Sequence, residues 1–539
     1  MVEKNKPLIH LKTHNIFILS VYFILGVSLY GKKNVFLCLS QTHAISSITS
    51  YGGRYQEFNV TPHLDRIAAD GVLFKNAFTS QGSAKLTLAT ILTRTEPTHA
   101  KFDTNGLDDT QSIQRLFQRD GYQTAFFGKW PFENLPKNFD YWEISTATDQ
   151  IYNPEIISPH STYEIEGHAT DVITDRAISW INQQTKTEKP IFIITLFHGT
   201  LKPWIPPIRF LELYNDRLLP EPKTLKTDYL SKAPPSRYQE VEILRNLDLA
   251  SDLFVETDEE SEGDDKSLNL AKPSPFDRLN DEQLSAWQLG IRPQNEAFTR
   301  INQDSAEALN WKYQRFVKNY LRCVHAIDEN IGRLYDIIMQ ENITNNWTFM
   351  YSACQGNFLG ENGWFGGNWI YEPAIRIPLI ITGDKYPKNK KSDFTIHLAD
   401  IYPTLLTYKS SKTSDGGNFP IMLDTNGSDT TKNLYFEHSI FPDISMVAKH
   451  YGIRTARHKL IHYHQFDEWE LFDLGEDPDE QNNIFERTEN ESLVNDLTKL
   501  LLFERRKQGY DNFKEPMPEE WRRIYRGPNA RKKERIGQP

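Results

Sequence analysis

The chain has 539 residues, of which 39% are hydrophobic, 12% aromatic and 25% charged. This length and composition are typical of a globular protein with one large core and a smaller subdomain. The formal net charge of −11 argues against nucleic acid or an anionic membrane surface as a partner.

The N-terminal segment is basic and then apolar. Lys4, Lys6 and Lys12 precede an apolar stretch of 15 residues, 16–30. A membrane-spanning helix needs about 20 apolar residues, and a basic segment followed by a short apolar one is typical of a secretory signal. We therefore predict that residues 1–31 are a signal peptide or a membrane anchor. The protein is expected to be exported, whether periplasmic, secreted or membrane-anchored.

Short apolar runs predict the buried strands of a sheet. In chain order, they are residues 34–40, 124–128, 191–197, 347–353 and 378–382. Helical patterns lie between them, one with Thr61 as the N-cap and Pro62 as the first residue, and the longest over 316–338. This alternation predicts an α/β fold, a sheet covered by helices on both faces. Ligands of such sheets bind beyond the carboxyl ends of the strands.

Changes in composition predict the domain boundaries. The main α/β domain covers residues 34–408 and contains an acidic insertion, 250–310, whose most acidic part is expected to be a solvated loop. A small C-terminal α+β subdomain covers 409–510, and a basic tail follows at 511–539. The three cysteines, Cys38, Cys323 and Cys354, are too few and too widely spaced for a disulfide framework.

Longer motifs follow one another along the chain. They read TPHLDRIAADGVLFKNAF (61–78), YLRCVHAIDENIGRLYDII (320–338), GNFLGENGWFGGNWIYEPAIRIPLIIT (356–382), LADIYPTLL (398–406) and ELFDLGEDPDEQNNI (470–484). In this order they resemble the formylglycine-dependent sulfatases of the alkaline-phosphatase-like superfamily. The shorter motifs IYNPEI, PWIPP and WFGGNW are most similar to bacterial carbohydrate sulfatases of the N-acetylglucosamine-6-sulfatase-like branch. The resemblance implies a large mixed sheet flanked by helices, with a small C-terminal subdomain.

The resemblance also implies a particular chemistry. In the family, a cysteine oxidised to formylglycine attacks the sulfur of a sulfate ester. Calcium, held by three carboxylates and an amide or imidazole, withdraws charge from the sulfate oxygens. Arginine and lysine stabilise the developing negative charge, and histidines transfer protons.

The positions that match this machinery have mostly lost it. Ala84 stands at the nucleophile, Leu88 at the arginine, Pro131 and Leu201 at two histidines and Gly367 at a lysine, whereas Lys129 is retained. The former metal-ligand positions are Gln41, Thr42, Cys354 and Gln355. Because neutral oxygens alone lack the charge that calcium needs, we expect no metal here. Because alanine stands at the nucleophile position, we also expect no formylglycine.

The sequence therefore predicts a catalytically inactive member of the family. Its role would be to bind a carbohydrate, including a sulfated glycan, or to act as a partner of an active sulfatase. The alternative is a divergent hydrolase of sulfate or phosphate esters of carbohydrates, with a remodelled site. The polar and aromatic residues expected around the ligand cleft are His43, Arg94, His99, Lys129, His198, Lys202 and Trp204, with Trp130 or Trp204 as a platform for a sugar ring.

Overall fold

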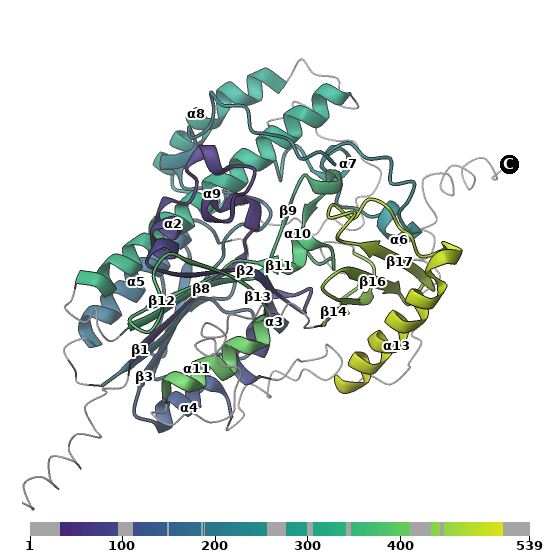
Figure 1. The fold of residues 1–539 in the computed structure, drawn as a ribbon. Helices are drawn as coiled ribbons and strands as arrows, with labels where there is room; N and C mark the ends of the chain where they lie inside the picture. The colour runs from purple at the N-terminus through teal and green to yellow at the C-terminus, as the bar shows by residue number, and fades with distance from the viewer. Residues whose placement is uncertain are drawn as a thin grey trace, which may run out of the picture.

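In the computed structural model, the chain is built around an 11-stranded mixed sheet with helices on both faces (Figure 1). The structure describes residues 33–94, 111–147, 150–184, 187, 189–255, 276–298, 305–340, 347–409, 433–441 and 447–509. Within this part, no helix is both long enough and apolar enough to cross a membrane. The predicted signal or anchor segment and the basic tail lie outside the described residues.

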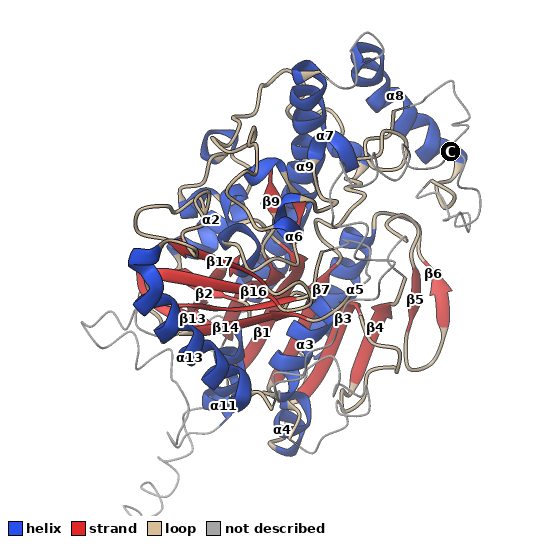
Figure 2. Ribbon diagram, turned by 90° about the vertical axis from the view of Figure 1, so that its right-hand side faces the viewer, coloured by secondary structure: helices blue, strands red, loops and turns tan. Residues whose placement is uncertain are grey.

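The strands of the large sheet are ordered β11-β2-β12-β8-β1-β7-β3-β4-β5-β6, with β13 paired to β2. Their bounds are β1 Asn34–Thr42, β2 Gly71–Phe78, β3 Gln123–Lys129, β4 Tyr141–Ser145, β5 Glu155–Ile157, β6 Thr162–Glu164, β7 Ile191–Phe197, β8 Trp347–Gln355, β11 Arg376–Ile377, β12 Leu379–Gly383 and β13 Lys390–His397. The neighbours β8, β1, β7, β3 and β4 run parallel, whereas β12 is antiparallel to both β2 and β8. Figure 2 shows this sheet extending from β1 to β6. Both β1 and β7 are buried along their whole length, as expected for central strands covered on both faces.

Two layers of helices cover the sheet. Their bounds are α2 Pro62–Ala69, α5 Ala169–Gln184 and α9 Ala306–Gln340 on one face, and α3 Ala84–Thr93, α4 Ile113–Arg119 and α11 Ile401–Lys409 on the other (Figure 1). Further helices are α6 Pro234–Arg237, α7 Ile243–Asn246, α8 Asp281–Phe298 and α10 Glu372–Ile375. The predicted α/β class is therefore confirmed.

The start of α2 differs from the prediction in one detail. Thr61 is at the N-cap position, but its hydroxyl accepts a hydrogen bond from Thr49 N–H instead of capping the helix. The carboxylate of Asp328 on α9 takes over that role, because it accepts from His63 N–H at 2.9 Å and Leu64 N–H at 2.7 Å. Burial raises the pKa of Asp328 to about 7. The cap thus comes from a residue far away in the sequence.

A four-stranded antiparallel sheet forms the C-terminal subdomain. It contains β14 Leu434–His438, β15 His450–Arg454, β16 His458–Tyr463 and β17 Glu468–Asp473, and α13 Glu491–Lys507 packs against it. A short hairpin, β9 Phe358–Leu359 and β10 Phe365–Gly366, lies in sequence between β8 and β11 of the large sheet. Gln81 bridges to Glu437 of β14, so the subdomain contacts the segment just before α3.

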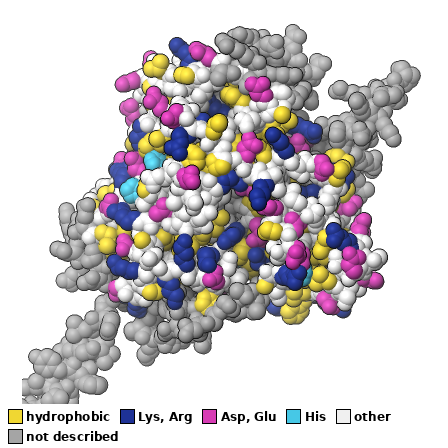
Figure 3. Space-filling view, turned by 45° about the horizontal axis from the view of Figure 1, so that its top comes forward, with side chains coloured by type: hydrophobic (Ala, Val, Ile, Leu, Met, Phe, Trp, Pro, Cys, Tyr) yellow, Lys and Arg dark blue, Asp and Glu magenta, His cyan; other side chains and the backbone are white. Residues whose placement is uncertain are grey.

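Part of the acidic insertion is folded against the protein. Leu253, Phe254 and Val255 are buried, and the carboxylate of Asp252 is buried and pairs with Lys202 at 2.8 Å. For these four residues, the expectation of a solvated loop is wrong, because three consecutive apolar side chains anchor the acidic stretch at its beginning. Residues 256–275 lie outside the described part of the chain. On the face drawn in Figure 3, side chains of the two charge signs are intermixed.

Candidate functional site

The carboxyl ends of the parallel strands meet at one edge of the large sheet. The register places Thr42 of β1 beside Gln355 of β8, and Gly128 of β3 beside Leu196 of β7. Lys129 directly follows Gly128, and His198 is two residues after Leu196. The structure therefore brings Gln41, Thr42, Lys129, His198, Cys354 and Gln355 to the same edge, which we call the strand-end site.

The segment that matches the family's nucleophile turn begins α3. Ala84 is the first residue of the helix, and the residues before it are held by β14, since Glu437 N–H donates to Ser80 and Gly82 N–H donates to Glu437. One helical turn later, Leu88 has 0% of its surface exposed. Leu88 belongs to the same apolar cluster as Trp130 and Cys354, with Ala84 packed against it. The leucine in the arginine position is thus a core residue.

The former metal-ligand positions carry neutral side chains, and two of these side chains form hydrogen bonds with other neutral side chains. The Thr42 hydroxyl lies 2.6 Å from the Thr200 hydroxyl, and Gln355 Nε2 donates to Asn368 Oδ1 at 3.2 Å. The Oε1 atom of Gln41 is buried and has no hydrogen-bond partner. Burial raises the pKa of the Cys354 thiol to about 12, so this sulfur stays protonated. Among the described residues, no group of three or more His, Cys, Asp and Glu could hold a metal ion.

The retained lysine and two histidines lie around these positions and are all buried. Lys129 donates to the Thr146 carbonyl, and in the described part of the chain neither ring nitrogen of His198 has a hydrogen-bond partner. Burial, and then the nearby charge of Lys129, lowers the pKa of His198 to about 3. His43 shares a hydrogen bond with the Tyr351 hydroxyl, and burial lowers its pKa to about 3. Both imidazoles are therefore neutral at pH 7.

Gly367 and Leu201 stand where the family has a lysine and a histidine. A Cβ atom on Gly367 would lie 3.5 Å from Gln355 Oε1, so this position borders the strand-end site. Leu201 and Pro131 are half-buried. Neither side chain can donate or accept a proton, whatever its position.

Other residues predicted for the cleft are placed elsewhere. Trp204 is 1% exposed and donates its indole N–H to the Thr200 carbonyl, and Trp130 is also buried and bonds Asn134. The prediction that one of them offers a face to a sugar ring therefore fails, because both rings are in the core. Lys202 is taken by the ion pair with Asp252.

Arg94 also lies away from the strand-end site. Arg94 is exposed and lies at the C-cap of α3, in the left-handed region at φ 62°. A helix rises about 1.5 Å per residue, so the ten residues of α3 separate Arg94 from Ala84 by about 15 Å. His99 lies outside the described residues.

A cavity of about 460 Å³ was not predicted. Its lining comes from residues 45–54, from the 221–224 loop, from 357–361 after β8, from 372–376 around α10, and from Asp479. None of the residues predicted for the site is among them. One signal was available in the sequence: Asn357 follows Gln355 by two residues, at the carboxyl end of a central strand.

Comparisons with known proteins identify the family. The family model described as Sulfatase matches residues 33–409, and the model for the C-terminal region of N-sulphoglucosamine sulphohydrolase matches residues 360–508. The chain belongs to the sulfatase family. It is 32% identical over 498 residues to N-acetylglucosamine-6-O-sulfatase of Bacteroides thetaiotaomicron, covering 89% of this chain and 87% of that protein. It is 25% identical over 509 residues to an arylsulfatase of Clostridium perfringens, covering 84% and 91%.

Solved structures agree with this sulfatase assignment. BT4656, in complex with its substrate D-glucosamine-2-N,6-O-disulfate, superposes with a TM-score of 0.81 at 30% identity, over 90% of this chain and all of that one. The phosphonate monoester hydrolase of Silicibacter pomeroyi superposes with a TM-score of 0.65 at 17% identity, over 88% and 96%, which supports the fold alone. The resemblance to the alkaline-phosphatase-like sulfatases is therefore confirmed at the level of family and fold.

Proposed function

We propose that this sulfatase-family protein does not hydrolyse sulfate esters and instead binds a carbohydrate. The observation that carries the proposal is the state of the turn at the start of α3. A methyl group stands at the nucleophile position, and the side chain at the arginine position, Leu88, packs into the core. An alanine cannot form the formylglycine that attacks sulfur, and a buried leucine cannot stabilise an anion.

The residues at the strand-end site also fit calcium poorly. Calcium takes six to eight oxygen ligands, several of them carboxylates. Here the candidate donors are the Gln41 and Gln355 amides and the Thr42 hydroxyl, and Thr42 already bonds Thr200. No step of a reaction is therefore assigned to calcium in this protein.

A carbohydrate ligand follows from the family and from the relatives. The most informative relatives act on, or are solved with, sulfated glucosamine derivatives. A chain that keeps this fold but lacks the reactive groups could still recognise such a sugar. A second role consistent with the proposal is association with an active sulfatase, for which export of both proteins, directed here by residues 1–31, would be required.

Turnover assays test the loss of hydrolysis. Full-length protein would be incubated with N-acetylglucosamine 6-sulfate and with 4-nitrophenyl sulfate, each in the presence of either millimolar calcium or EDTA. We expect sulfate release at the rate of the protein-free control in all four mixtures. Release that depends on protein and is abolished by EDTA would refute the proposal. Release that is insensitive to EDTA would also refute it, in favour of a remodelled hydrolase.

A further inference from the structure

The 460 Å³ cavity has no role in the account given so far. We propose that it binds an acidic sugar, meaning a hydroxyl-rich mono- or disaccharide that carries one sulfate or carboxylate group. This inference rests on the proposed carbohydrate-binding function, and it places the ligand in this cavity instead of the strand-end site.

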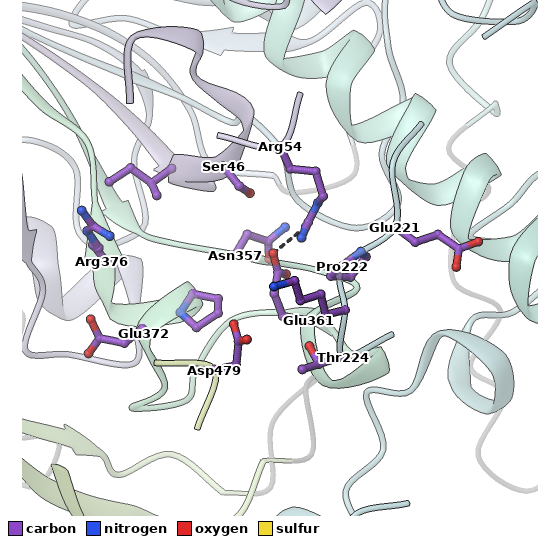
Figure 4. Close-up of a pocket in the computed structure, with 13 residues that line it drawn as sticks. Ser46, Arg54, Glu221, Pro222, Thr224, Asn357, Glu361, Glu372, Arg376 and Asp479 are labelled. Atoms are coloured by element: carbon purple, nitrogen blue, oxygen red, sulfur yellow. Dashed lines mark hydrogen bonds and ion pairs between the residues drawn. The ribbon is translucent and has the colours of Figure 1, made fainter. Parts of the chain in front are cut away.

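Several separate segments surround the cavity (Figure 4). Arg54 enters from the N-terminal segment after β1, Pro222 and Thr224 lie on the 221–224 loop, and Asp479 comes from the C-terminal subdomain. Its volume falls within the range of about 300–1,000 Å³ that is usual for small-molecule sites. A ligand in this position would contact both the main domain and the subdomain.

Two buried donors in the cavity wall lack acceptors. Asn357 is 4% exposed, and its Nδ2 atom has no hydrogen-bond partner among the residues that the structure describes. Arg54 donates through Nη2 to the Leu359 carbonyl at 3.1 Å and to the Glu361 carboxylate at 2.5 Å, but its buried Nε has no partner. Buried donors are rarely left unpaired in native proteins, so each such atom needs an explanation. Oxygen atoms of a bound ligand would satisfy both.

Two cations on the cavity lining are available to an acidic group of a ligand. Within the described part of the chain, neither Arg376 nor Lys223 forms an ion pair; Arg376 donates Nε and Nη2 to the Lys75 carbonyl, and Lys223 is exposed. The inner carboxylates are already compensated, because Glu361 pairs with Arg54, and Glu372 pairs with Arg454 and Lys459.

The rim of the cavity supplies the complementary acceptors. Glu221 and Asp479 are exposed lining residues, and sugar hydroxyls can donate to their carboxylates. A ligand with hydroxyl groups and one anionic group therefore matches the whole lining. A bare inorganic anion would leave these rim carboxylates unused, because it has no hydroxyl hydrogen to donate to them.

Calorimetric titration of the full-length protein tests the site. The probes are N-acetylglucosamine 6-sulfate, glucuronic acid, unsulfated N-acetylglucosamine and sodium sulfate. We expect saturable binding of at least one of the two acidic sugars, and binding of the neutral sugar and of sulfate at least about fivefold weaker. Either of two results would overturn the proposal. In one, neither acidic sugar binds; in the other, sulfate alone binds as tightly as the acidic sugar.

Variants locate the binding. N357D exchanges the unpaired Nδ2 donor for an oxygen of like charge to the ligand, and should weaken binding at least about tenfold, or about 1.4 kcal/mol. K223Q removes an exposed charge without touching the core and should weaken binding about threefold to fivefold. K226Q is the matched control, since Lys226 is exposed on the same loop and does not line the cavity. Unchanged affinity in K223Q and N357D, or an equal loss in K226Q, would overturn the assignment.

The same titration separates this inference from the proposed loss of hydrolysis. Free sulfate is measured in the cell after each run. Sulfate release with cavity variants behaving as expected would refute the loss of hydrolysis and leave the cavity site standing. No release, with affinity insensitive to K223Q and N357D, would refute the cavity site alone.

Discussion

Restoring the family's arginine at position 88 should destabilise the protein and should not restore hydrolysis of sulfate esters. Leu88 is 0% exposed and packs among apolar residues of α3, α4 and the sheet. Removing such a leucine costs about 2.7–5 kcal/mol, as in other buried leucine-to-alanine changes. A buried guanidinium adds a desolvation penalty of several kcal/mol, and the nearby strand-end site offers only neutral Gln41, Thr42 and Gln355 to offset it. We therefore expect L88A to lose about 3 kcal/mol and L88R at least about 4 kcal/mol.

Urea unfolding followed by far-ultraviolet circular dichroism measures these losses. Leu135 is 51% exposed, so L135R is the matched control and should change the unfolding free energy by less than about 0.5 kcal/mol. If L88R is as stable as the wild type, position 88 faces an open, polar site and the argument for a core residue is wrong. Stabilisation of L88R by sodium sulfate would have the same meaning, because it would require an anion at that arginine.

Further outcomes follow from the buried charges and thiols. Lys459 is 0% exposed, and its Nζ atom lies 2.9 Å from Glu372 and 2.6 Å from Glu480. K459M should therefore lower the free energy of urea unfolding by about 3–5 kcal/mol. An unchanged free energy would mean that the ion pairs are not buried. Because the pKa values of His43 and His198 are lowered to about 3, the unfolded chain binds more protons below pH 6.5, and stability should fall as pH drops from 6.5 toward 3; a flat profile of urea midpoints would contradict this. Addition of calcium or EDTA should shift the thermal midpoint by less than about 1 °C, whereas a rise of several degrees with calcium would reveal a site that binds the folded state. Burial raises the pKa values of Cys38 and Cys354 to about 12, so neither thiol should react with Ellman's reagent until urea is added.

Much of the fold follows from the sequence because its central strands are continuous apolar runs. The run at 191–197 is β7 without a change of bounds, and the runs at 34–40 and 347–353 extend by two residues each into β1 and β8. β13 was not predicted, because polar residues interrupt its sequence. β13, KKSDFTIH, is only partly buried, so its sequence gives neither an apolar run nor a strict alternation.

The strand-end site was predictable in position and less so in environment. The match to the family's motifs placed Ala84, Lys129 and Gln355 at one edge of the sheet, because each motif lies at the end of a strand or in the turn before a helix. It could not show that Trp204 is buried or that Lys202 pairs with Asp252, since the paired residues are 50 positions apart. Burial and pairing are properties of the tertiary structure, and a motif does not encode them.

The strand-end site and the cavity differ in how well they can accommodate an anionic ligand. At the strand-end site, Lys129 is buried and bonded to Thr146, the imidazoles are neutral, and Leu88 closes one side. An anion entering there would lose its hydration against apolar surface. In the cavity, Lys223 and Arg376 form no ion pair with a described residue, and two buried donors find no acceptor in the same part of the chain. An acidic sugar is therefore expected in the cavity and not at the strand-end site, and L88R and K223Q test the two sites independently.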